Sequence, residues 1–312
     1  MCIRDRHNLG VGSGPHGQQT GRMLELIEQI LSAESPRAVL LYGDTNSTLA
    51  GALAAAKLHL PVAHVEAGVR SFNRAMPEEI NRVVTDHIAD WLFCPSAVAR
   101  DNLQSEGITS GVFVVGDVMY DCWLRGAEDE CERSGVLSEL SLLDAGDSPE
   151  RFCLATIHRP ENTESPERLR SIVSALEAIP MRVVLPLHPR TRDAASHLHL
   201  GSRGDVAVIE PLGYAGMQEL ERSASLIVTD SGGVQKEAYF AGVPCITARD
   251  ETEWVETVES GWNRVVGADR DEIINCADYY YSWSPPERKE LYGDGAAAQH
   301  IASELVQLLS AR

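Results

Sequence analysis

The sequence predicts an α/β protein in which two domains each contain a mostly parallel sheet. Short apolar runs alternate with amphipathic helical stretches, and this alternation is typical of consecutive β-α-β units. The chain has 312 residues, of which 44% are apolar, so it can bury the cores of two domains. An acidic stretch with glycine and serine at residues 128–149 separates the two series of strands, and we expect the domain boundary near Ser148.

The first half of the chain is expected to supply a short series of strands and helices. The strands are predicted at residues 38–42, 62–66, 91–94 and 112–115. The helices are predicted at residues 21–33, 48–58, 77–87 and 97–106. A doubly wound domain usually opens with a buried strand whose following loop faces the ligand, and residues 1–20 contain no such pattern. We therefore expect the first domain, residues 1–147 with the connector, to lack its first strand and loop.

The second half is expected to supply a fuller sheet. Its strands are predicted at residues 152–156, 183–187, 206–209, 226–229 and 245–247. Its helices are predicted at residues 166–178, 216–223, 233–241 and 271–280, with a short connector helix within 136–143. We expect residues 148–295 to form the second domain, and a closing helix at 296–309, within residues 296–312, to pack back on the first domain.

The composition excludes several classes of function. A formal charge of −19 argues against binding nucleic acid or an anionic membrane through bulk electrostatics. No apolar run approaches the roughly 20 residues that span a bilayer, and the start lacks the pattern of a signal peptide. The seven cysteines are odd in number and contain no CxxC pair, which indicates a reduced, cytoplasmic protein without a zinc site or a disulfide framework.

The strongest local signal is the segment TDSGGVQKE, which joins a predicted strand to a predicted helix. Gly232 and Gly233 allow the backbone to approach a ligand closely, and the helix N-terminus offers free N–H groups and a positive dipole end. Ser231 adds a hydroxyl donor, so the turn can hold a phosphate. Glu237, about one turn into the helix, can reach a ribose diol. The alternative is a tight turn in which Asp230 or Ser231 only caps the helix.

A second polar cluster, HRPEN, follows the predicted strand at 152–156. The carboxyl ends of strands in such sheets face the ligand crevice. His158 can transfer protons near neutral pH, and Arg159 can bind a phosphate. The alternative is that the segment only begins the next helix and His158 lies on the surface. His188 ends the next strand in the same way, and a proline-bounded loop is its alternative role.

Acidic groups follow the strands of the first half. Asp44 is either a catalytic carboxylate or part of a group that caps the next helix, whereas Glu66 ends a strand where it can act as a general acid or base. Glu78 and Arg82 are four residues apart and share one helical face, where a solvated ion pair is the alternative. Because polar groups follow strands in both halves, a cleft between two domains would gather them.

Taken together, the motifs resemble the non-hydrolysing UDP-N-acetylglucosamine 2-epimerase family over about residues 8–311. The motifs are YGDTNST at 42–48, HVEAG at 64–68, RAMPEEINR at 74–82, VGDVMYD at 115–121, IHRPEN at 157–162, LHPRTR at 187–192 and TDSGGVQKEA at 229–238. Their order and spacing make the resemblance far more specific than any one glycine-rich loop. It implies two Rossmann-like domains in a glycosyltransferase-B-like arrangement, with UDP held mainly by the second domain.

The resemblance also implies the site residues, motif by motif. The implied catalytic residues are Asp44, Glu66, Glu78 and His158. The implied substrate-binding residues are Arg82, Arg159, Ser231, Gly232, Gly233 and Glu237. The resemblance implies neither a cofactor nor a metal. It also implies that the protein forms a homodimer.

The family chemistry implies how these groups would act. A base removes the C2 proton while UDP leaves C1, which gives a 2-acetamidoglucal, and UDP re-adds after a proton returns to the opposite face of C2. The C2 proton is weakly acidic, so charge-matched donors must favour departure of the diphosphate. Proton transfers on two opposite faces explain why several carboxylates and a histidine would act together.

Two departures from the family pattern affect the expectations. Family members begin with a strand and a basic loop that this sequence lacks, and residues 1–6 resemble nothing in the family. We expect weak or no turnover from the chain as it stands, and equal rates with and without an added first segment would contradict this.

In family members a second UDP-sugar can act as an activator, for which Gln18, Gln19, Thr20 and His188 are candidate regions.

The second departure concerns the substrate. The loop RDETEW at 249–254 is more similar to members that act on UDP-2,3-diacetamido-2,3-dideoxyglucuronate than to the RDTTER pattern of plain N-acetylglucosamine enzymes. UDP-N-acetylglucosamine is the first choice and the diacetamido uronate is the alternative. A glycosyltransferase of the same fold, a hydrolysing 2-epimerase and a non-catalytic UDP-sugar-binding protein are the competing functions.

Overall fold

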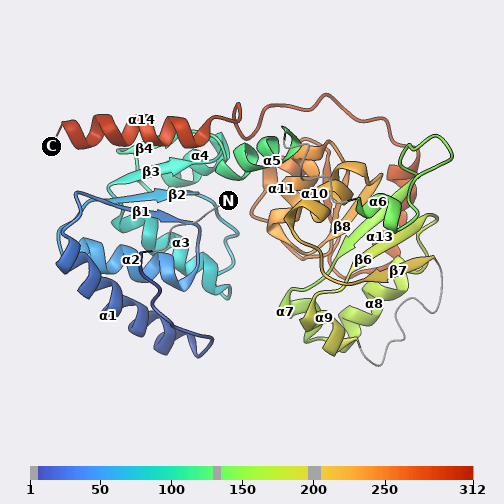
Figure 1. The fold of residues 1–312 in the computed structure, drawn as a ribbon, viewed down its shortest axis with the longest axis horizontal. Helices are drawn as coiled ribbons and strands as arrows, with labels where there is room; N and C mark the ends of the chain where they lie inside the picture. Colours follow the sequence, from blue (N-terminus) through green and yellow to red (C-terminus); the bar gives the residue numbers. More distant parts are fainter. Residues whose placement is uncertain (1–5, 129–134, 196–204, 312) are drawn as a thin grey trace. The chain divides into compact units, whose positions relative to one another are not determined.

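The computed structural model describes residues 6–128, 135–195 and 205–311. The chain divides into two compact units, Met1–Asp121 with Glu290–Arg312, and Cys122–Lys289, and each contains one parallel sheet (Figure 1). Most of the opening segment 1–6, predicted to be unlike the family, lies outside the described residues. No helix in the described ranges is both long and apolar enough to cross a bilayer.

The first unit contains a four-stranded sheet of order β1-β2-β3-β4. Its strands are β1 (Val39–Tyr42), β2 (Val62–Val65), β3 (Trp91–Cys94) and β4 (Val112–Val114). All neighbours are parallel. Strands β2 and β3 are buried along their whole length, whereas β1 alternates between half-buried and exposed residues, as an edge strand does.

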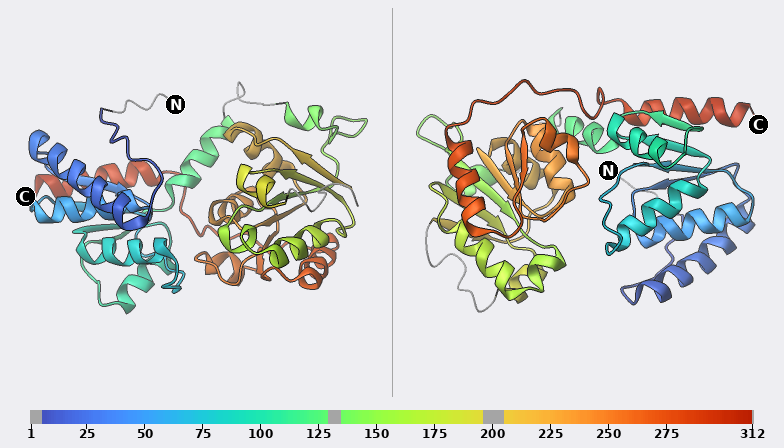
Figure 2. Two further views of the ribbon diagram at one scale, coloured as in Figure 1. Left: turned by 90° about the horizontal axis from the view of Figure 1, so that it is seen from below. Right: turned by 180° about the vertical axis from the view of Figure 1, so that it is seen from behind.

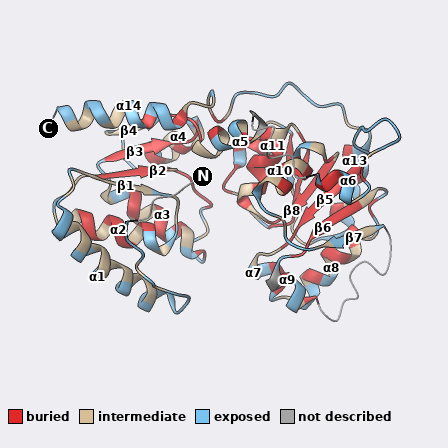
Figure 3. Cartoon of the chain, in the orientation of Figure 1, coloured by how far each residue is buried: buried red, intermediate tan, exposed pale blue. Residues whose placement is uncertain are grey.

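Helices cover both faces of this sheet. They are α1 (His16–Glu34), α2 (Asn46–Lys57), α3 (Pro77–Ile88), α4 (Ala97–Ser105) and α14 (Ala297–Ser310). Ile301 of α14 packs on Val65 and Phe93, whereas Ala52 and Ala55 of α2 pack on the opposite face. Helix α1 lies along α2, and Figure 3 shows it mainly as half-buried and exposed.

The second unit contains a six-stranded sheet of order β10-β9-β8-β5-β6-β7, again with only parallel neighbours. Its strands are β5 (Phe152–Thr156), β6 (Arg182–Pro186), β7 (Val206–Ile209), β8 (Leu226–Thr229), β9 (Cys245–Thr247) and β10 (Asn263–Val265). Strands β5 and β8 are fully buried because helices cover both sides of the sheet.

Successive residues of β5 face two different helical layers. The helices of this unit are α6 (Val136–Glu139), α7 (Pro160–Thr163), α8 (Pro166–Leu176), α9 (Pro189–Ala194), α10 (Tyr214–Ser223), α11 (Gly232–Ala241), α12 (Val255–Glu259) and α13 (Arg270–Tyr281). Helices lie on both faces of this sheet (Figures 1 and 2). Cys153 and Ala155 pack with α8 and α13, whereas Phe152 and Leu154 pack with α6, α10 and α11. The period of two along the strand produces this division.

The structure differs from the sequence-based expectations in several elements. The prediction omitted β10, α7, α9, α12 and helix α5 (Val118–Glu128). Helix α1 begins at His16 rather than at residue 21. The second compact unit begins at Cys122, before the boundary expected near Ser148, because Trp123 of α5 packs against Phe240 with ring centroids 6.2 Å apart.

Candidate functional site

The glycine-rich turn joins β8 to α11 in the second unit. Ser231 is the N-cap of α11, and its hydroxyl accepts a hydrogen bond from the Val234 N–H. A Cβ at Gly232 would lie 2.6 Å from Oε1 of the buried Glu253, so a side chain there would displace the Glu253 carboxylate, which pairs with Arg249. The helix therefore presents its N-terminal N–H groups at a turn where glycine avoids a clash with Glu253.

Asp230 organises the neighbouring strand ends. Its carboxylate is fully buried and accepts hydrogen bonds from the backbone N–H groups of His158 and Arg159 at 2.9–3.1 Å. The Asn162 amide also donates to it, at 3.0 Å, and donates to the Ala248 carbonyl at 2.9 Å. One carboxylate thus fixes the start of the HRPEN segment beside the glycine-rich turn.

The two histidines that follow β5 and β6 lie next to each other. The ring centroids of His158 and His188 are 5.5 Å apart, and His158 Nδ1 lies 3.5 Å from the Asp230 carboxylate. About a third of the His158 side chain is exposed, so it can meet a ligand and transfer a proton. The parallel order of β5 and β6 brings these residues from distant positions in the sequence to one edge of the sheet.

Glu237 lies one turn beyond the capped start of α11. Glu237 is only 8% exposed, and Glu221 on α10 is a second buried acid whose charge acts on it. Burial raises the pKa of Glu237 to about 7, against a smaller lowering by Lys236. Burial and the neighbouring Glu237 raise the pKa of Glu221 well above its usual value.

In the first unit, the loop after β1 is tied to helix α3. Arg82 of α3 pairs with the Asp44 carboxylate, and the Asn81 amide donates to the Asp44 carbonyl at 2.8 Å. Arg82 is only 3% exposed, so its guanidinium is buried where it contacts Asp44, whereas the alternative considered from the sequence was a solvated ion pair with Glu78. Glu79 also lies 3.6 Å from the same guanidinium.

The loop after β2 places Glu66 in an uncommon backbone conformation. Glu66 has a φ of 72°, and its N–H donates to the Phe93 carbonyl at 3.1 Å. Gly68, with a φ of 79°, approaches α4 so closely that a Cβ would lie 2.2 Å from the Ala99 carbonyl oxygen. A non-glycine residue with positive φ is held there by its surroundings, and such positions are frequent at functional sites.

Glu78 and Glu79 are neighbours on α3 with different surroundings. Glu79 is buried and accepts hydrogen bonds from the N–H and the hydroxyl of Ser71 and from the Phe72 N–H, at 2.8–3.0 Å. Glu78 is only half-buried. Glu79 therefore holds the loop before α3, and Glu78 is the carboxylate of this pair with room to meet a ligand.

A buried charge network supports the strand ends of the first unit. His64 donates through both ring nitrogens, from Nδ1 to the Asp86 carboxylate at 2.6 Å and from Nε2 to the Gly43 carbonyl at 2.8 Å. The Asp86 carboxylate also accepts from the Gly68 N–H at 3.0 Å and from Arg70 at 2.7 Å. The network thus joins the loops after β1 and β2, which carry Asp44 and Glu66.

The charges in this network shift the pKa values of its members. Burial alone would lower the pKa of His64, but the hydrogen bond to Asp86 and its charge raise it. Burial alone would raise the pKa of Asp86, but His64 and Arg70 lower it. Both shifts favour a charged pair.

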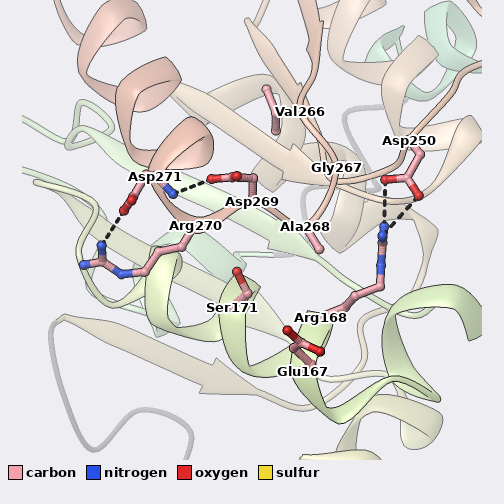
Figure 4. Close-up of a pocket in the computed structure, with 10 residues that line it drawn as sticks. All are labelled: Glu167, Arg168, Ser171, Asp250, Val266, Gly267, Ala268, Asp269, Arg270 and Asp271. Atoms are coloured by element: carbon pink, nitrogen blue, oxygen red, sulfur yellow. Dashed lines mark hydrogen bonds and ion pairs between the residues drawn. The ribbon is translucent and has the colours of Figure 1, made fainter.

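Two pockets are lined by residues other than the predicted site residues, and Glu79 lines the smaller one. One, of about 630 Å³, is lined by residues of α8, of the loop after β9 and of the loop between β10 and α13, and Figure 4 shows Arg168 facing Asp250 across it. Two hydrogen bonds of 3.1 Å join that pair. The other, of about 300 Å³, is lined by residues that include Phe72 and His87. None of the predicted site residues lines either pocket.

Known proteins match this chain over almost its whole length. The sequence profile of a family described as UDP-N-acetylglucosamine 2-epimerase matches residues 1–306. The UDP-2,3-diacetamido-2,3-dideoxy-D-glucuronate 2-epimerase of Pseudomonas aeruginosa is 50% identical over 308 residues, which cover 97% of this chain and 84% of that protein. The chain belongs to the UDP-N-acetylglucosamine 2-epimerase family.

Solved structures of family members have the same fold. The UDP-GlcNAc 2-epimerase of Methanocaldococcus jannaschii, in complex with UDP-GlcNAc and UDP, has a TM-score of 0.87 and 42% identity, over 98% of this chain and 85% of that chain. The enzyme of Neisseria meningitidis bound to UDP-GlcNAc also has a TM-score of 0.87, with 30% identity, over 98% and 86% of the two chains. The predicted α/β class and the predicted family are confirmed, and this family member is an isomerase.

The structure of this epimerase brings some of the predicted site residues together within each unit. In the second unit, the backbones of His158 and Arg159 share the Asp230 carboxylate, next to Ser231. In the first unit, Arg82 contacts Asp44. Their roles toward a ligand stay predictions.

The sequence prediction missed several supporting residues. Asp230 was considered only as a helix cap, although an acid at the end of an apolar strand is a signal for such a role. Glu79, Asp86 and Glu221 have no local signal, because each lies on a helix among other polar residues and is buried only through tertiary packing.

Proposed function

We propose that this protein interconverts UDP-N-acetylglucosamine and UDP-N-acetylmannosamine by eliminating and re-adding UDP. The observation that carries the proposal is the arrangement around Asp230, which fixes the His158-Arg159 segment beside the glycine-rich start of α11. A helix N-terminus next to a histidine and an arginine suits a diphosphate that must leave and return. The UDP-GlcNAc bound in two structurally similar family members supports the same ligand class.

UDP would be held mainly by the second unit. The N–H groups at Gly232 and Gly233 would bind phosphate oxygens together with the Ser231 hydroxyl, and Arg159 would offset the charge of the leaving diphosphate. Glu237 would accept hydrogen bonds from the ribose hydroxyls. These roles use the close backbone approach at Gly232, where a side chain would press on the Glu253 carboxylate.

Proton transfer at C2 would fall to acidic groups and a histidine. Asp44, Glu66, Glu78 and His158 are the residues proposed for it. Removal of the C2 proton breaks the C2–H bond, and the electron pair of that bond forms the C1–C2 double bond. The C1–O bond breaks at the same time, and UDP leaves with the electron pair of the C1–O bond. The reverse addition on the other face of C2 needs a second proton carrier. Arg82, paired with Asp44, would steady the sugar or diphosphate.

UDP-2,3-diacetamido-2,3-dideoxyglucuronate is the second candidate substrate. The Pseudomonas aeruginosa relative is named for this sugar, and the loop at 249–254 favours the same branch. In that loop Arg249 and Glu253 form a buried ion pair at 2.8 Å. Glu253 already neutralises the charge of Arg249. Recognition of the sugar's C6 carboxylate would therefore need a different cationic group.

Proton NMR of the two candidate UDP-sugars, incubated with the protein in deuterated water, tests the proposal. We expect loss of the C2 proton signal of UDP-N-acetylglucosamine and the appearance of its C2 epimer with UDP still attached. Turnover of the diacetamido uronate alone would replace the substrate assignment. Free N-acetylmannosamine would indicate a hydrolysing enzyme, and binding without C2 exchange would contradict epimerase activity.

The proposed setting is a reduced cytoplasm, and the proposed assembly is a homodimer. The free thiols of Cys94, Cys153 and Cys245 are buried, and burial raises their pKa values, which makes them unreactive. The thiol of Cys122 is free although it is exposed, and this supports a reducing compartment. Light scattering of the purified protein tests the assembly, and a monomeric mass would contradict a dimer.

A further inference from the structure

The side-chain amide of Asn162 uses its oxygen and both of its N–H groups in hydrogen bonds. Asn162 belongs to α7 and is only 1% exposed. Its nitrogen donates to the Asp230 carboxylate at 3.0 Å and to the Ala248 carbonyl at 2.9 Å, and its oxygen accepts from Arg168 Nε at 3.0 Å. These partners fix the orientation of the amide, because carboxylate and carbonyl oxygens only accept and a guanidinium only donates.

Arg168 holds a second partner at the same time. It lies in the first turn of α8, where the N-cap Ser165 accepts a hydrogen bond from the Arg168 N–H at 3.4 Å. Its two terminal nitrogens each donate to the Asp250 carboxylate at 3.1 Å (Figure 4). A rigid, planar guanidinium can hold two partners in fixed directions, which a lysine ammonium does not do. We call Arg168 with Asn162 and Asp250 the guanidinium clamp.

The loop that carries Asp250 is itself attached to the sheet. The Ala248 N–H donates to the Thr229 carbonyl at 2.8 Å, and the Gly267 N–H donates to the Arg249 carbonyl at 2.9 Å. These bonds lie on the two residues that precede Asp250 in the chain. The guanidinium clamp therefore joins the HRPEN segment to a loop that the backbone already holds in place.

The clamp acts on the same carboxylate that organises the strand ends. One oxygen of Asp230 accepts from the amide of Asn162 at 3.0 Å and from the N–H groups of His158 and Arg159 at 2.9–3.1 Å. The charge of Arg168 polarises the amide and strengthens its bond to Asp230. Without Arg168 the amide oxygen would lose its donor, and a buried acceptor left without a partner favours rearrangement of the segment.

We propose that Arg168 is a positioning residue, which holds the HRPEN segment in place through Asn162 and Asp230. The inference rests on the proposed function, because that function gives His158 a proton to transfer and Arg159 a diphosphate to bind. Arg168 would serve the epimerisation without taking part in either step.

Kinetic measurements separate positioning from binding. Arg168→Ala should lower kcat by about 10- to 100-fold, because a small displacement of a catalytic group has effects of this size. The affinity for UDP should stay close to that of the wild type, because the glycine-rich turn and Glu237 hold UDP without the clamp. Arg170→Ala replaces an exposed arginine of the same helix and should leave both quantities unchanged.

Steady-state epimerisation rates and isothermal titration with UDP measure the two quantities, and melting temperatures establish that each variant is folded. A kcat of Arg168→Ala equal to that of the wild type overturns the inference. A loss of UDP affinity as large as the loss of kcat also overturns it, because that result indicates general disorder of the site.

A double-mutant cycle tests the route through Asn162. If Arg168 acts through this amide, adding Arg168→Ala to Asn162→Ala should lower kcat by less than about twofold further. Two losses that multiply would show that Arg168 acts independently of Asn162 and would overturn the route.

A ligand-free measurement separates this inference from the proposed function. In proton–nitrogen NMR spectra, the backbone N–H signals of His158 and Arg159 and the side-chain amide signals of Asn162 should shift in Arg168→Ala. The same signals should stay in place in Arg170→Ala. If the wild type has no epimerase activity, the proposed function fails, and the spectra still decide whether Arg168 holds the segment. Signals that coincide in Arg168→Ala and the wild type overturn the inference.

Discussion

In the two units of this epimerase, the pKa values of buried carboxyl groups are shifted in opposite directions. In the first unit Asp86 faces His64 and Arg70, and its pKa is lowered because cations surround it. In the second unit the charge of Glu237 acts on Glu221, and the pKa values of both are raised. The first arrangement favours a fixed charge, whereas the second disfavours one.

The difference shows how surroundings decide what a buried acid does. A carboxylate among cations and N–H groups stays ionised over the physiological range and acts as a rigid support for two loops. A carboxyl pair titrates near neutrality and makes its neighbourhood sensitive to pH. Asp230 is a third case, since backbone N–H groups of His158 and Arg159 and the Asn162 amide surround its charge.

The largest expected effect contrasts two neighbours of the first unit, Glu78 and Glu79. Glu78→Gln should reduce kcat by about 10²- to 10⁴-fold without changing the melting temperature, because it removes a proton carrier. Glu79→Gln should lower the melting temperature, because Glu79 accepts three hydrogen bonds from Ser71 and Phe72. Steady-state epimerisation rates and thermal melts measure both. An unchanged kcat in Glu78→Gln would remove that residue from the mechanism.

The next effect tests the cationic surroundings in the first unit. Asp86→Ala should destabilise the fold by about 3–5 kcal/mol, because it leaves His64 and Arg70 buried without their shared partner. Urea denaturation measures it. Asp101→Ala, which breaks an exposed pair with Arg100, is the control and should cost less than about 0.5 kcal/mol. An equal loss in free energy of unfolding for Asp86→Ala and Asp101→Ala would contradict a stabilising role of the buried charges around Asp86.

A third prediction uses the opposite sign of the pKa shift at Glu221. Its pKa is raised in the folded state, so above pH 4.5 the unfolded chain gains free energy by ionising and the folded protein loses stability as the pH rises. Position 221 cannot ionise in Glu221→Gln, so the free energy of unfolding of this variant should rise relative to that of the wild type as the pH increases from 4.5 to 8. Denaturant titrations at several pH values test this. A constant difference would mean that Glu221 is not kept neutral by the fold.

The smallest expected effect concerns the backbone of the glycine-rich turn. Gly232→Ala should cost about 1–2 kcal/mol of stability and about tenfold in UDP affinity, because its Cβ would meet Glu253, which is held by Arg249. Gly21→Ala, at an open position of α1, should instead be neutral or slightly stabilising. Denaturation and UDP titration of both variants compare them. An unaffected UDP affinity in Gly232→Ala would argue against phosphate binding at this turn.

Much of the fold could be predicted from the sequence, because buried parallel strands are short apolar runs. The predicted bounds of β3, β5, β7, β8 and β9 agree with the structure. Strand β10 was missed because Asn263 and Arg264 interrupt any apolar run. It forms a strand because its backbone pairs with β9 at the edge of the sheet, and the amino-acid composition gives no sign of this pairing. Helix α5 was missed because the stretch was interpreted as a motif and a connector, although Trp123 anchors it.

The candidate site was predictable only where strand ends carry polar residues. Glu66, His158 and Ser231 follow apolar runs directly, so topology alone places them at the carboxyl edges of the sheets. Glu221 lies in the helical sequence MQELERS, which is typical of a solvated helix. Glu221 is buried because α11 packs against α10, and the local sequence around Glu221 does not show this packing.

The stereochemical course of hydrogen at C2 tests the central claim most directly. If one residue removes the C2 proton and a different residue returns one to the opposite face, the incoming hydrogen must come from solvent. In deuterated water, mass spectrometry of the first UDP-N-acetylmannosamine formed from UDP-N-acetylglucosamine should therefore find one deuterium in every product molecule. Product that retains the original hydrogen at C2, or a protein that forms none, would contradict the account.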